Sequence, residues 1–243
     1  MLTRPADNRE RHNNIEFVDC AHLVIRGLRF QGGSSGVRFI RGHHVTLEGC
    51  EIFETGDDAL TMNSGDGHAF VIRSNHIHHT GLSVRGPTEG MHIGCHDGRC
   101  CTTDSLFEGN YIHHTRSTSD GGNDGIEIKF GSHGNVVRNN VIHDTNLGRQ
   151  YPGIFVYGGG PGRNVVEGNV IWQAGEGIQV VSDAVVRNNI GGVIALAEYW
   201  MSRQLPRRSG VRRGQVQPRR ACAVLLSSVA GVQGSRMGVT VVG

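Results

Sequence analysis

The feature that most constrains this chain is an internal repeat built around asparagine. The segments SNHIHHT, GNYIHHT, NNVIHDT and GNVIWQA begin at residues 74, 109, 139 and 168. We take the second residue of each segment as the anchor of its repeat. Two weaker copies of the repeat precede these segments and a last copy follows them. In chain order the anchors are Leu28, Cys50, Asn75, Asn110, Asn140, Asn169 and Asn189. Successive anchors are 22, 25, 35, 30, 29 and 20 residues apart. Repeats of this length with insertions predict the coils of a β-solenoid.

Charges alternate in sign two residues before each anchor. In chain order these positions are Arg26, Glu48, Arg73, Glu108, Arg138, Glu167 and Arg187. In a parallel, in-register stack such side chains lie about 4.8 Å apart, where opposite charges attract and like charges repel. The column therefore predicts one outward face on which each residue lies one coil from the next.

Apolar residues flank this column and predict strands with one buried face. Three residues before the anchors stand Ile25, Leu47, Ile72, Phe107, Val137, Val166 and Val186. A second strand is expected in each coil, at 36–40, 58–62, 90–94, 125–129, 153–157 and 177–181. In the second of these we expect Ala59 and Thr61 to face the core and Leu60 and Met62 to face outward.

The repeated asparagines are expected to be structural. Asparagine tolerates the left-handed conformation of tight turns. Stacked asparagine amides can also hydrogen-bond along the axis of a stack. The residue before each anchor is small or turn-prone, as at Gly109 and Asn139.

The columns as a whole resemble those of the right-handed parallel β-helix superfamily, which includes pectate lyases, polygalacturonases, and alginate and chondroitin lyases. The resemblance covers about residues 15–190. It implies an all-β, right-handed, single-stranded parallel β-helix of about seven coils. Fold alone does not determine activity, so function has to be argued from the site.

Beyond Asn189 the repeat pattern stops, and residues 191–243 are expected to be a non-repeat, Arg-rich tail. Residues 195–243 contain 8 Arg and one acid, whereas residues 1–194 carry a net charge of −5. The Arg, Gly, Val, Ala, Pro and Ser bias matches GC-rich DNA read out of frame. We therefore expect this tail to be disordered or out of frame, with a basic interaction tail as the alternative.

Other features narrow the class of protein. No apolar run reaches the roughly 18 residues of a membrane-spanning helix. The sequence pI near 8.3 reflects only the Arg-rich tail, so it says nothing about nucleic-acid binding. We expect a monomer with neither a nucleic-acid nor a membrane partner. The polar start MLTRPADNRERHNN lacks the apolar region of a secretory signal. We expect that upstream sequence is missing and that the protein is extracellular or periplasmic.

Insertions in three consecutive coils predict a groove beside the second strand. They lie around 81–88, 116–122 and 146–151. Loops added to successive coils stack on one side of a rigid scaffold, which is where function usually resides. The residues expected along this groove are His92, Glu127, Lys129, Phe155 and Tyr157. The two outward aromatic rings would stack on a sugar, or a loop would cover them.

The segment TGDDALTMNSG, residues 55–65, resembles the aspartate turn of polygalacturonases. Those enzymes show a His-Gly turn one coil later and an Arg-Ile-Lys strand one coil further, where this chain has Glu89-Gly90 and Glu127-Ile128-Lys129. The resemblance implies inverting hydrolysis, in which one carboxylic acid protonates the leaving oxygen while others activate water. An Asn-Thr-Asp element expected one coil earlier is absent from residues 31–37.

A lyase is the rival enzyme. It would use a cation to neutralise a uronate carboxylate, so that a base can remove the proton from the adjacent carbon. The segment SDGGNDGIEIK offers Asp120, Asn123, Asp124 and Glu127 as oxygen ligands for calcium. Lys129, the single lysine of the chain, would be the base, since lysine loses its proton more readily than arginine. A plain Glu–Lys surface pair is the alternative.

The candidate site residues can be stated together. The catalytic candidates are Asp57, Asp58, His92 and Lys129, and the substrate-binding candidates are Glu89, Glu127, Phe155 and Tyr157. The leading hypothesis is a secreted carbohydrate-active protein that binds and cleaves an acidic polysaccharide, as a lyase or a glycoside hydrolase, with calcium as the one candidate cofactor. The alternative is a non-enzymatic β-helix repeat protein with a surface or structural role.

Histidine and cysteine clusters complete the inventory. His78, His113 and His143 fall in one column, and we expect a stacked surface ladder rather than a metal site, since imidazoles one rung apart do not converge on one ion. Cys95 and Cys100 could close a small disulfide loop, bind zinc or stay free.

Overall fold

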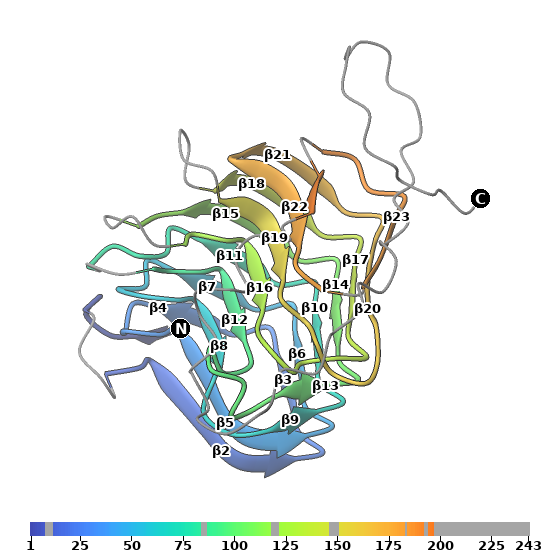
Figure 1. Ribbon diagram of the computed structural model, residues 1–243. Coiled ribbons are helices and arrows are strands. Elements are labelled where there is room, and N and C mark those ends of the chain that lie inside the picture. The colour runs from blue at the N-terminus through green and yellow to red at the C-terminus, as the bar shows by residue number, and fades with distance from the viewer. Residues whose placement is uncertain are drawn as a thin grey trace, which may run out of the picture.

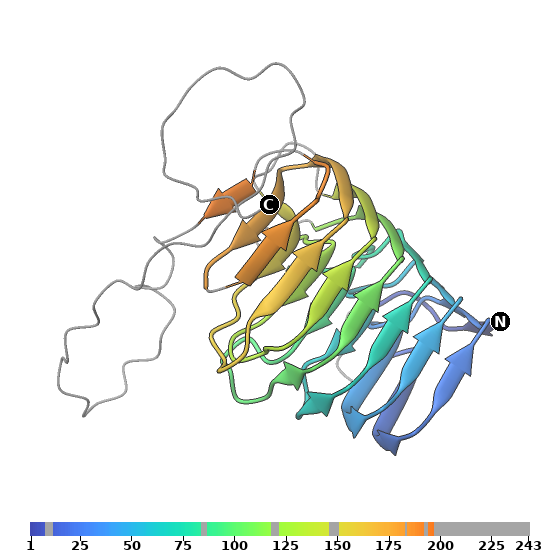
Figure 2. The same cartoon turned by 90° about the vertical axis from the view of Figure 1, so that its right-hand side faces the viewer.

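The computed structural model describes residues 1–7, 12–83, 87–117, 122–145, 151–182, 184–191 and 194–196. These residues form a right-handed parallel β-helix with three parallel sheets and no helix (Figure 1). Hence none of them makes a helical segment that could cross a membrane. The predicted all-β solenoid is confirmed, and Figure 2 shows its coils stacked from the blue N-terminal end to the orange end.

The coils contribute strands to each of the three sheets, and two coils contribute two strands to the largest sheet. The sheet that we call the histidine sheet contains β1 (Leu2–Thr3), β4 (Arg29–Gln31), β7 (Glu51–Phe53), β11 (His76–His78), β15 (Tyr111–Thr115), β18 (Val141–Thr145) and β21 (Val170–Ala174). The sheet that we call the ion-pair sheet contains β3 (Val24–Arg26), β6 (Thr46–Glu48), β10 (Val71–Arg73), β14 (Leu106–Glu108), β17 (Val136–Arg138), β20 (Asn164–Glu167) and β23 (Ala184–Arg187).

The third sheet, called here the ten-stranded sheet, holds the predicted second strands. It contains β2 (Ile15–Ala21), β5 (Val37–His43), β8 (Leu60–Met62), β9 (Gly67–His68), β12 (Met91–Ile93), β13 (Thr102–Thr103), β16 (Ile126–Ile128), β19 (Pro152–Val156), β22 (Glu176–Val180) and β24 (Ile194–Leu196). The core lies between the three sheets, where Leu47, Ile72, Phe107 and Ile126 are fully buried.

The alternating charge column lies in register along the ion-pair sheet, as predicted. Arg26 and Arg73 both pair with Glu48 of β6, and the Arg73 Nε donates to a Glu48 carboxylate oxygen over 2.6 Å. Further along, Arg138 pairs with Glu108 over 2.7 Å. Each guanidinium in these pairs is well exposed, so the column stabilises by only a few tenths of a kcal/mol per pair.

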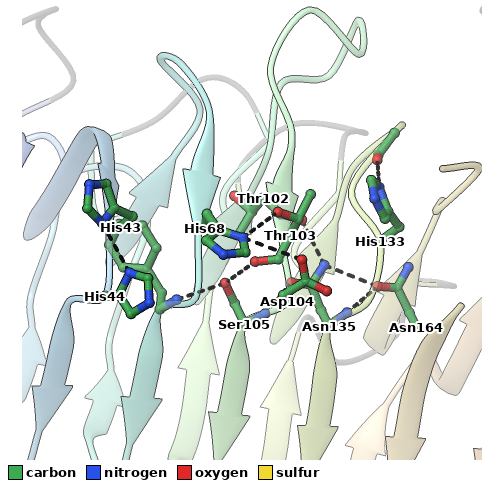
Figure 3. Close-up of polar contacts among 12 residues, drawn as sticks. His43, His44, His68, Thr102, Thr103, Asp104, Ser105, His133, Asn135 and Asn164 are labelled. Atoms are coloured by element: carbon green, nitrogen blue, oxygen red, sulfur yellow. Dashed lines mark hydrogen bonds and ion pairs between the residues drawn. The ribbon is translucent and has the colours of Figure 1, made fainter. Parts of the chain in front are cut away.

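The asparagines form the predicted amide ladder along the axis. The Nδ2 of Asn75 donates to the Oδ1 of Asn110 over 3.0 Å, and the same bond repeats from Asn110 to Asn140, on to Asn169 and on to Asn189. A second ladder, which the sequence repeat did not reveal, joins Asn135 to Asn164 at another corner (Figure 3). The asparagines are therefore structural.

The left-handed residue in these turns is the one before the anchor, contrary to our expectation for the anchors themselves. Ser74, Asn139 and Asn188 have φ of 54°, 56° and 55°. The anchor asparagine instead turns its amide inward and also donates to a backbone carbonyl, as Asn110 does to Ile72. The small preceding residue is required by its positive φ.

One further expectation is corrected. In β8, Leu60 pairs with Met91 and Thr61 with His92, so Leu60 and Met62 face the core and Thr61 faces outward, one residue out of step with the prediction. Past Asn189 the structure describes one short strand, β24, which pairs with β22. The rest of the predicted Arg-rich tail, residues 197–243, lies outside the described residues.

Candidate functional site

The predicted site residues gather on the outer side of the ten-stranded sheet, in three adjacent columns. The first column stands just before strands β8, β12 and β16, where the register places Asp58, Glu89 and Asp124 on successive coils. The second runs through the outward position of consecutive strands, as Thr61, His92, Glu127 and Phe155. The third brings Lys129 beside Tyr157 at the ends of β16 and β19.

Glycines at the corner before each strand hold the first column close to the second. A Cβ on Gly90 would lie 2.5 Å from the Gly125 carbonyl oxygen, and one on Gly125 would lie 2.5 Å from the Ile142 side chain. Neither position therefore accepts a larger residue without movement of the neighbouring coil. The close corner keeps the acids that precede these glycines within reach of the outward-facing strand residues.

The first contact group joins Asp58, Glu89 and His92. An Asp58 carboxylate oxygen accepts the Glu89 backbone N–H over 2.8 Å. The His92 Nδ1 lies 3.5 Å from the second Asp58 oxygen and 3.4 Å from a Glu89 oxygen. Burial alone would lower the pKa of His92, but these two carboxylates raise it to about 10. The imidazole is therefore a cation at neutral pH.

The second contact group joins Glu127, Lys129 and Tyr157. The Lys129 ammonium lies 2.5 Å from a Glu127 oxygen and 5.4 Å from the centre of the Tyr157 ring. Burial opposes the charge on Lys129, yet Glu127 and Glu89 raise its pKa above the usual value. Burial and the charge of Glu127 also raise the pKa of the Tyr157 hydroxyl. Both groups hold their protons at neutral pH.

The carboxyl groups in the same cluster titrate far above their ordinary range. Burial, followed by the charge of Glu89, raises the pKa of Asp57 to about 6 and that of Glu127 to about 7. Burial and the charge of Glu127 also raise the pKa of Asp124. Such shifts gather where acid–base chemistry takes place, although structural charge networks produce them too.

The cluster is more enclosed than the open cleft that we expected. The side chains of Glu127 and Lys129 are 3% and 6% exposed, and that of His92 is 15% exposed. Asp57, Phe155 and Tyr157 are half-buried. Residues 84–86, 118–121 and 146–150 of the three insertions lie outside the described residues. Solvent therefore meets Asp57, His92 and the two aromatic rings, with the remaining acids and the lysine behind them.

The predicted calcium ligands separate into different places. Asp120 lies outside the described residues. Asn123 is fully buried, with its amide Nδ2 donating to the Thr115 carbonyl and its Oδ1 accepting from Thr88, so its side chain ties the insertion to the coil. Glu89, Asp124 and Glu127 instead bring carboxylate oxygens within 4.8 Å of one another. Within the described residues, Asp124 Oδ1 and Glu127 Oε2 are buried and have no hydrogen-bond partner.

Sequence reasoning missed three neighbours of the cluster. Thr61 occupies the outward position next to His92 and is almost fully buried. The Phe130 ring lies 4.6 Å from that of Tyr157, which itself stacks on Phe155 at 4.2 Å. The His96 ring lies edge-on to that of Tyr157, with 6.5 Å between the ring centres, in a loop that the Cys95–Cys100 disulfide closes. The disulfide was one of the predicted alternatives, and Cys101 is a free thiol.

The histidine column forms the predicted surface ladder. The rings of His78, His113 and His143 stack at 5.2 and 5.1 Å with their planes nearly parallel. The ladder continues onto Trp172, whose ring centre lies 4.3 Å from that of His143. On this outer face of the histidine sheet, successive rings lie one rung apart, as expected for in-register strands.

The fold and the enclosed acid–base cluster together define a β-solenoid that carries a candidate site on the outer side of one sheet. The family model described as right handed beta helix region matches residues 13–190, and the chain belongs to that family. Among solved structures, an alginate lyase from Paenibacillus sp. str. FPU-7 is similar in fold, with a TM-score of 0.56 and 20% identity over 75% of this chain and 74% of that chain. The fold is thus like that of a polysaccharide lyase. No curated protein matches the sequence.

Proposed function

We propose that the protein binds an acidic polysaccharide along the ten-stranded sheet and cleaves it by β-elimination. The observation that carries the proposal is the pair of cations, His92 and Lys129, held beside carboxyl groups whose pKa values are raised to about 6 and about 7. The half-buried Phe155 and Tyr157, stacked on each other, supply an aromatic platform for sugar rings. The polysaccharide-lyase-like fold supports the same class of substrate.

The two cations would act on the uronate carboxylate. The His92 imidazolium and the Lys129 ammonium lie on adjacent coils, since His92 pairs with Glu127 and Lys129 follows Glu127 by two residues. Positive charge beside the carboxylate stabilises the negative charge that develops when the adjacent carbon loses its proton. The raised pKa of Lys129 favours this role over that of the base, which our sequence interpretation gave it.

Asp57 would transfer the proton. Above a pH of about 6 the Asp57 carboxylate is ionised and half-exposed, so it can accept the proton from the carbon next to the carboxylate. The C–H electron pair forms the new C=C bond, and the bond to the glycosidic oxygen breaks. The same Asp57 carboxyl group gives its new proton to that oxygen and so returns to its starting state. Tyr157 lies three coils further along the sheet and belongs to the aromatic platform.

Calcium fits part of this cluster. Glu89, Asp124 and Glu127 offer oxygen ligands of the type that Ca²⁺ prefers, and the buried oxygens Asp124 Oδ1 and Glu127 Oε2 have no other partner in the described part of the chain. When bound there, the ion would add positive charge that helps to neutralise the uronate. The Lys129 ammonium already contacts the other Glu127 oxygen, so ion and lysine would share this carboxylate.

The direct test is to incubate the protein with a panel of uronate polymers and to follow the ultraviolet absorbance of the unsaturated product. We expect Asp57→Asn to lower kcat by about 10²-fold or more, the usual contribution of general acid–base catalysis. Asp104→Asn, an exposed aspartate outside the cluster, is the matched control and should leave the rate unchanged. Absence of unsaturated product from every polymer would overturn the lyase proposal.

Hydrolysis is the second candidate, because Asp57, with a pKa raised to about 6, and the neighbouring Glu89 could share the acid and base roles of an inverting glycosidase. A hydrolase would release new reducing ends without ultraviolet absorbance. Asp58→Asn should then reduce turnover, since Asp58 fixes both Glu89 and His92. If neither product forms and Lys129→Met leaves sugar binding unchanged, the non-enzymatic scaffold takes the place of both enzyme proposals.

A further inference from the structure

A second polar cluster lies on the histidine sheet, away from the candidate site. The outer face of β7, β11 and β15 presents two columns of side chains, one through Glu51 and His76 and the other through His78 and His113. Within the second column the rings stack and do not converge. The His76 ring of the first column instead contacts the His113 ring of the second column, which lies one coil further along, and only the structure reveals this contact.

Three potential ligand atoms converge here, and a fourth lies beside one of them. The Nε2 atoms of His76 and His113 lie 2.8 Å apart, and the His78 Nε2 lies 3.2 Å from a Glu51 carboxylate oxygen. The ligand atoms of Glu51, His76 and His78 all lie within 4.8 Å of one another. Ligands about 2.1 Å from a tetrahedral Zn²⁺ are roughly 3.4 Å apart, so Glu51, His76 and His78 need only small movements. The His113 ring, which stacks 5.2 Å from that of His78, has to turn towards the ion.

From this convergence we propose that Glu51, His76, His78 and His113 form a binding site for a divalent transition metal of the Zn²⁺ type. Three imidazoles and one carboxylate are ligands that Zn²⁺ accepts, whereas Ca²⁺ prefers oxygen alone. The ion would join three successive coils through β7, β11 and β15, and so would stabilise the stack. This site does not depend on the proposed polysaccharide cleavage.

The outer contacts of the four residues support a metal at their centre. The Nδ1 atoms of His78 and His113 lie 2.8 and 2.7 Å from the Nδ1 atoms of His79 and His114. Each can therefore donate its Nδ1–H outward while its Nε2 lone pair faces the ion, which is the arrangement usual for ligating histidines. The second oxygen of Glu51 accepts from Arg29, which holds the carboxylate in place. All four side chains are half-buried, so the ion can reach them from solvent.

The test titrates Zn²⁺ into full-length, tag-free protein by isothermal calorimetry after treatment with a chelator. A histidine tag has to be absent because it would itself bind the metal. We expect one Zn²⁺ equivalent that the double variant His76→Asn/His113→Asn binds at least about 100-fold more weakly. Zn²⁺ should raise the Tm of the parent protein and leave that of the variant unchanged.

The matched control is His43→Asn/His44→Asn. This exposed pair has the same Nδ1–Nδ1 contact, at 3.0 Å, but lies on the ten-stranded sheet (Figure 3), and its removal should leave the Zn²⁺ equivalent intact. If the test variant does not fold, Glu51→Gln decides instead, since it keeps the side-chain shape and should weaken Zn²⁺ at least about tenfold. Equal Zn²⁺ uptake by the parent protein and the test variant would overturn the proposal, as would loss of the equivalent in the control alone.

Discussion

The ion-pair sheet and the ten-stranded sheet stack charged side chains with the same rung spacing but with opposite electrostatic results. On the ion-pair sheet, the Arg138 side chain is 40% exposed, and a hydrogen bond from Arg73 lowers the pKa of Glu48. On the ten-stranded sheet, Glu127 is almost fully buried, and burial raises its pKa to about 7 despite the adjacent Lys129. Glu48 contacts two arginines, whereas Glu127 lies beside Glu89 as well as Lys129. Burial and the balance of neighbouring charges, rather than spacing, thus decide whether a stacked charge is a mild stabiliser or a group that can exchange a proton near neutral pH.

The largest difference should appear when one cation is removed from each sheet. Lys129→Met leaves Glu127 buried without its partner, which should cost about 3–5 kcal/mol of unfolding free energy. Arg138→Met removes an exposed guanidinium and should cost less than about 1 kcal/mol. Urea denaturation at pH 8, where Glu127 is ionised, measures both. Equal costs would show that burial of the cluster does not govern its energy.

A second difference should appear in the pH dependence of stability. The folded-state pKa of His92, about 10, lies above its ordinary value of 6.5, so its protonation stabilises the folded state fully below about pH 6.5. That stability is lost as the pH rises towards 10, with a slope of up to about 1.4 kcal/mol per pH unit for one proton. Urea denaturation at pH 7, 8 and 9 should show this slope, and His92→Gln should flatten it.

Glu48 provides the matched comparison on the ion-pair sheet. Its folded-state pKa is lowered, so its contribution is complete above its ordinary value of 4.5 and is lost as the pH falls below that value. Glu48→Gln should therefore leave the slope between pH 7 and 9 as it is in the parent protein. If the slope of unfolding free energy against pH disappeared in Glu48→Gln and persisted in His92→Gln, its assignment to His92 would be wrong.

The smallest effect should come from reversing one charge in the exposed column. Arg138→Glu places three acids on successive coils, with Glu108 before it and Glu167 after it. We expect it to destabilise by about 1 kcal/mol, and Arg138→Gln by only a few tenths. Because exposed charges are screened, the difference should shrink in 1 M salt. A difference that salt does not change would mean that the column is less exposed than the structure indicates.

The fold could be predicted from sequence because its signal repeats in every coil. The Arg–Glu alternation, the asparagine anchors and the buried column through Ile72 and Phe107 each report the same register, and an error in one coil is corrected by its neighbours. The second ladder escaped notice because it joins only two asparagines, Asn135 and Asn164, so no run of asparagines marks its column.

The site was only partly predictable, because its register rests on one ambiguous segment. Residues Ala59, Leu60 and Met62 are all apolar, so hydrophobicity alone does not say which of them face the core. The polar Thr61 between Leu60 and Met62 was the available signal. Aligning Ala59 with Gly90 and Gly125, as the structure does, would have placed Asp58, Glu89 and Asp124 in one column.

Burial was the other quantity that sequence could not supply. Spacing predicted that His92, Glu127 and Lys129 would lie together, and the structure brings them together. Their protonation states depend on how closely the insertions and the aromatic rings enclose them. Burial raises the pKa of Glu127 against the effect of Lys129, and neither composition nor spacing determines how deeply such a group is buried.

The amide ladder and the charge column next to it have different periods along the solenoid. This difference sets the number of coils by which the solenoid can lengthen or shorten. The amide ladder repeats with every coil, because each asparagine offers the same donor and acceptor to the next. The charge column repeats only with every second coil, because its sign alternates. Removal of the coil between Asn75 and Asn140 would restore the amide bond but place Arg73 directly against Arg138. Gene duplication or deletion that preserves both columns therefore proceeds in pairs of coils.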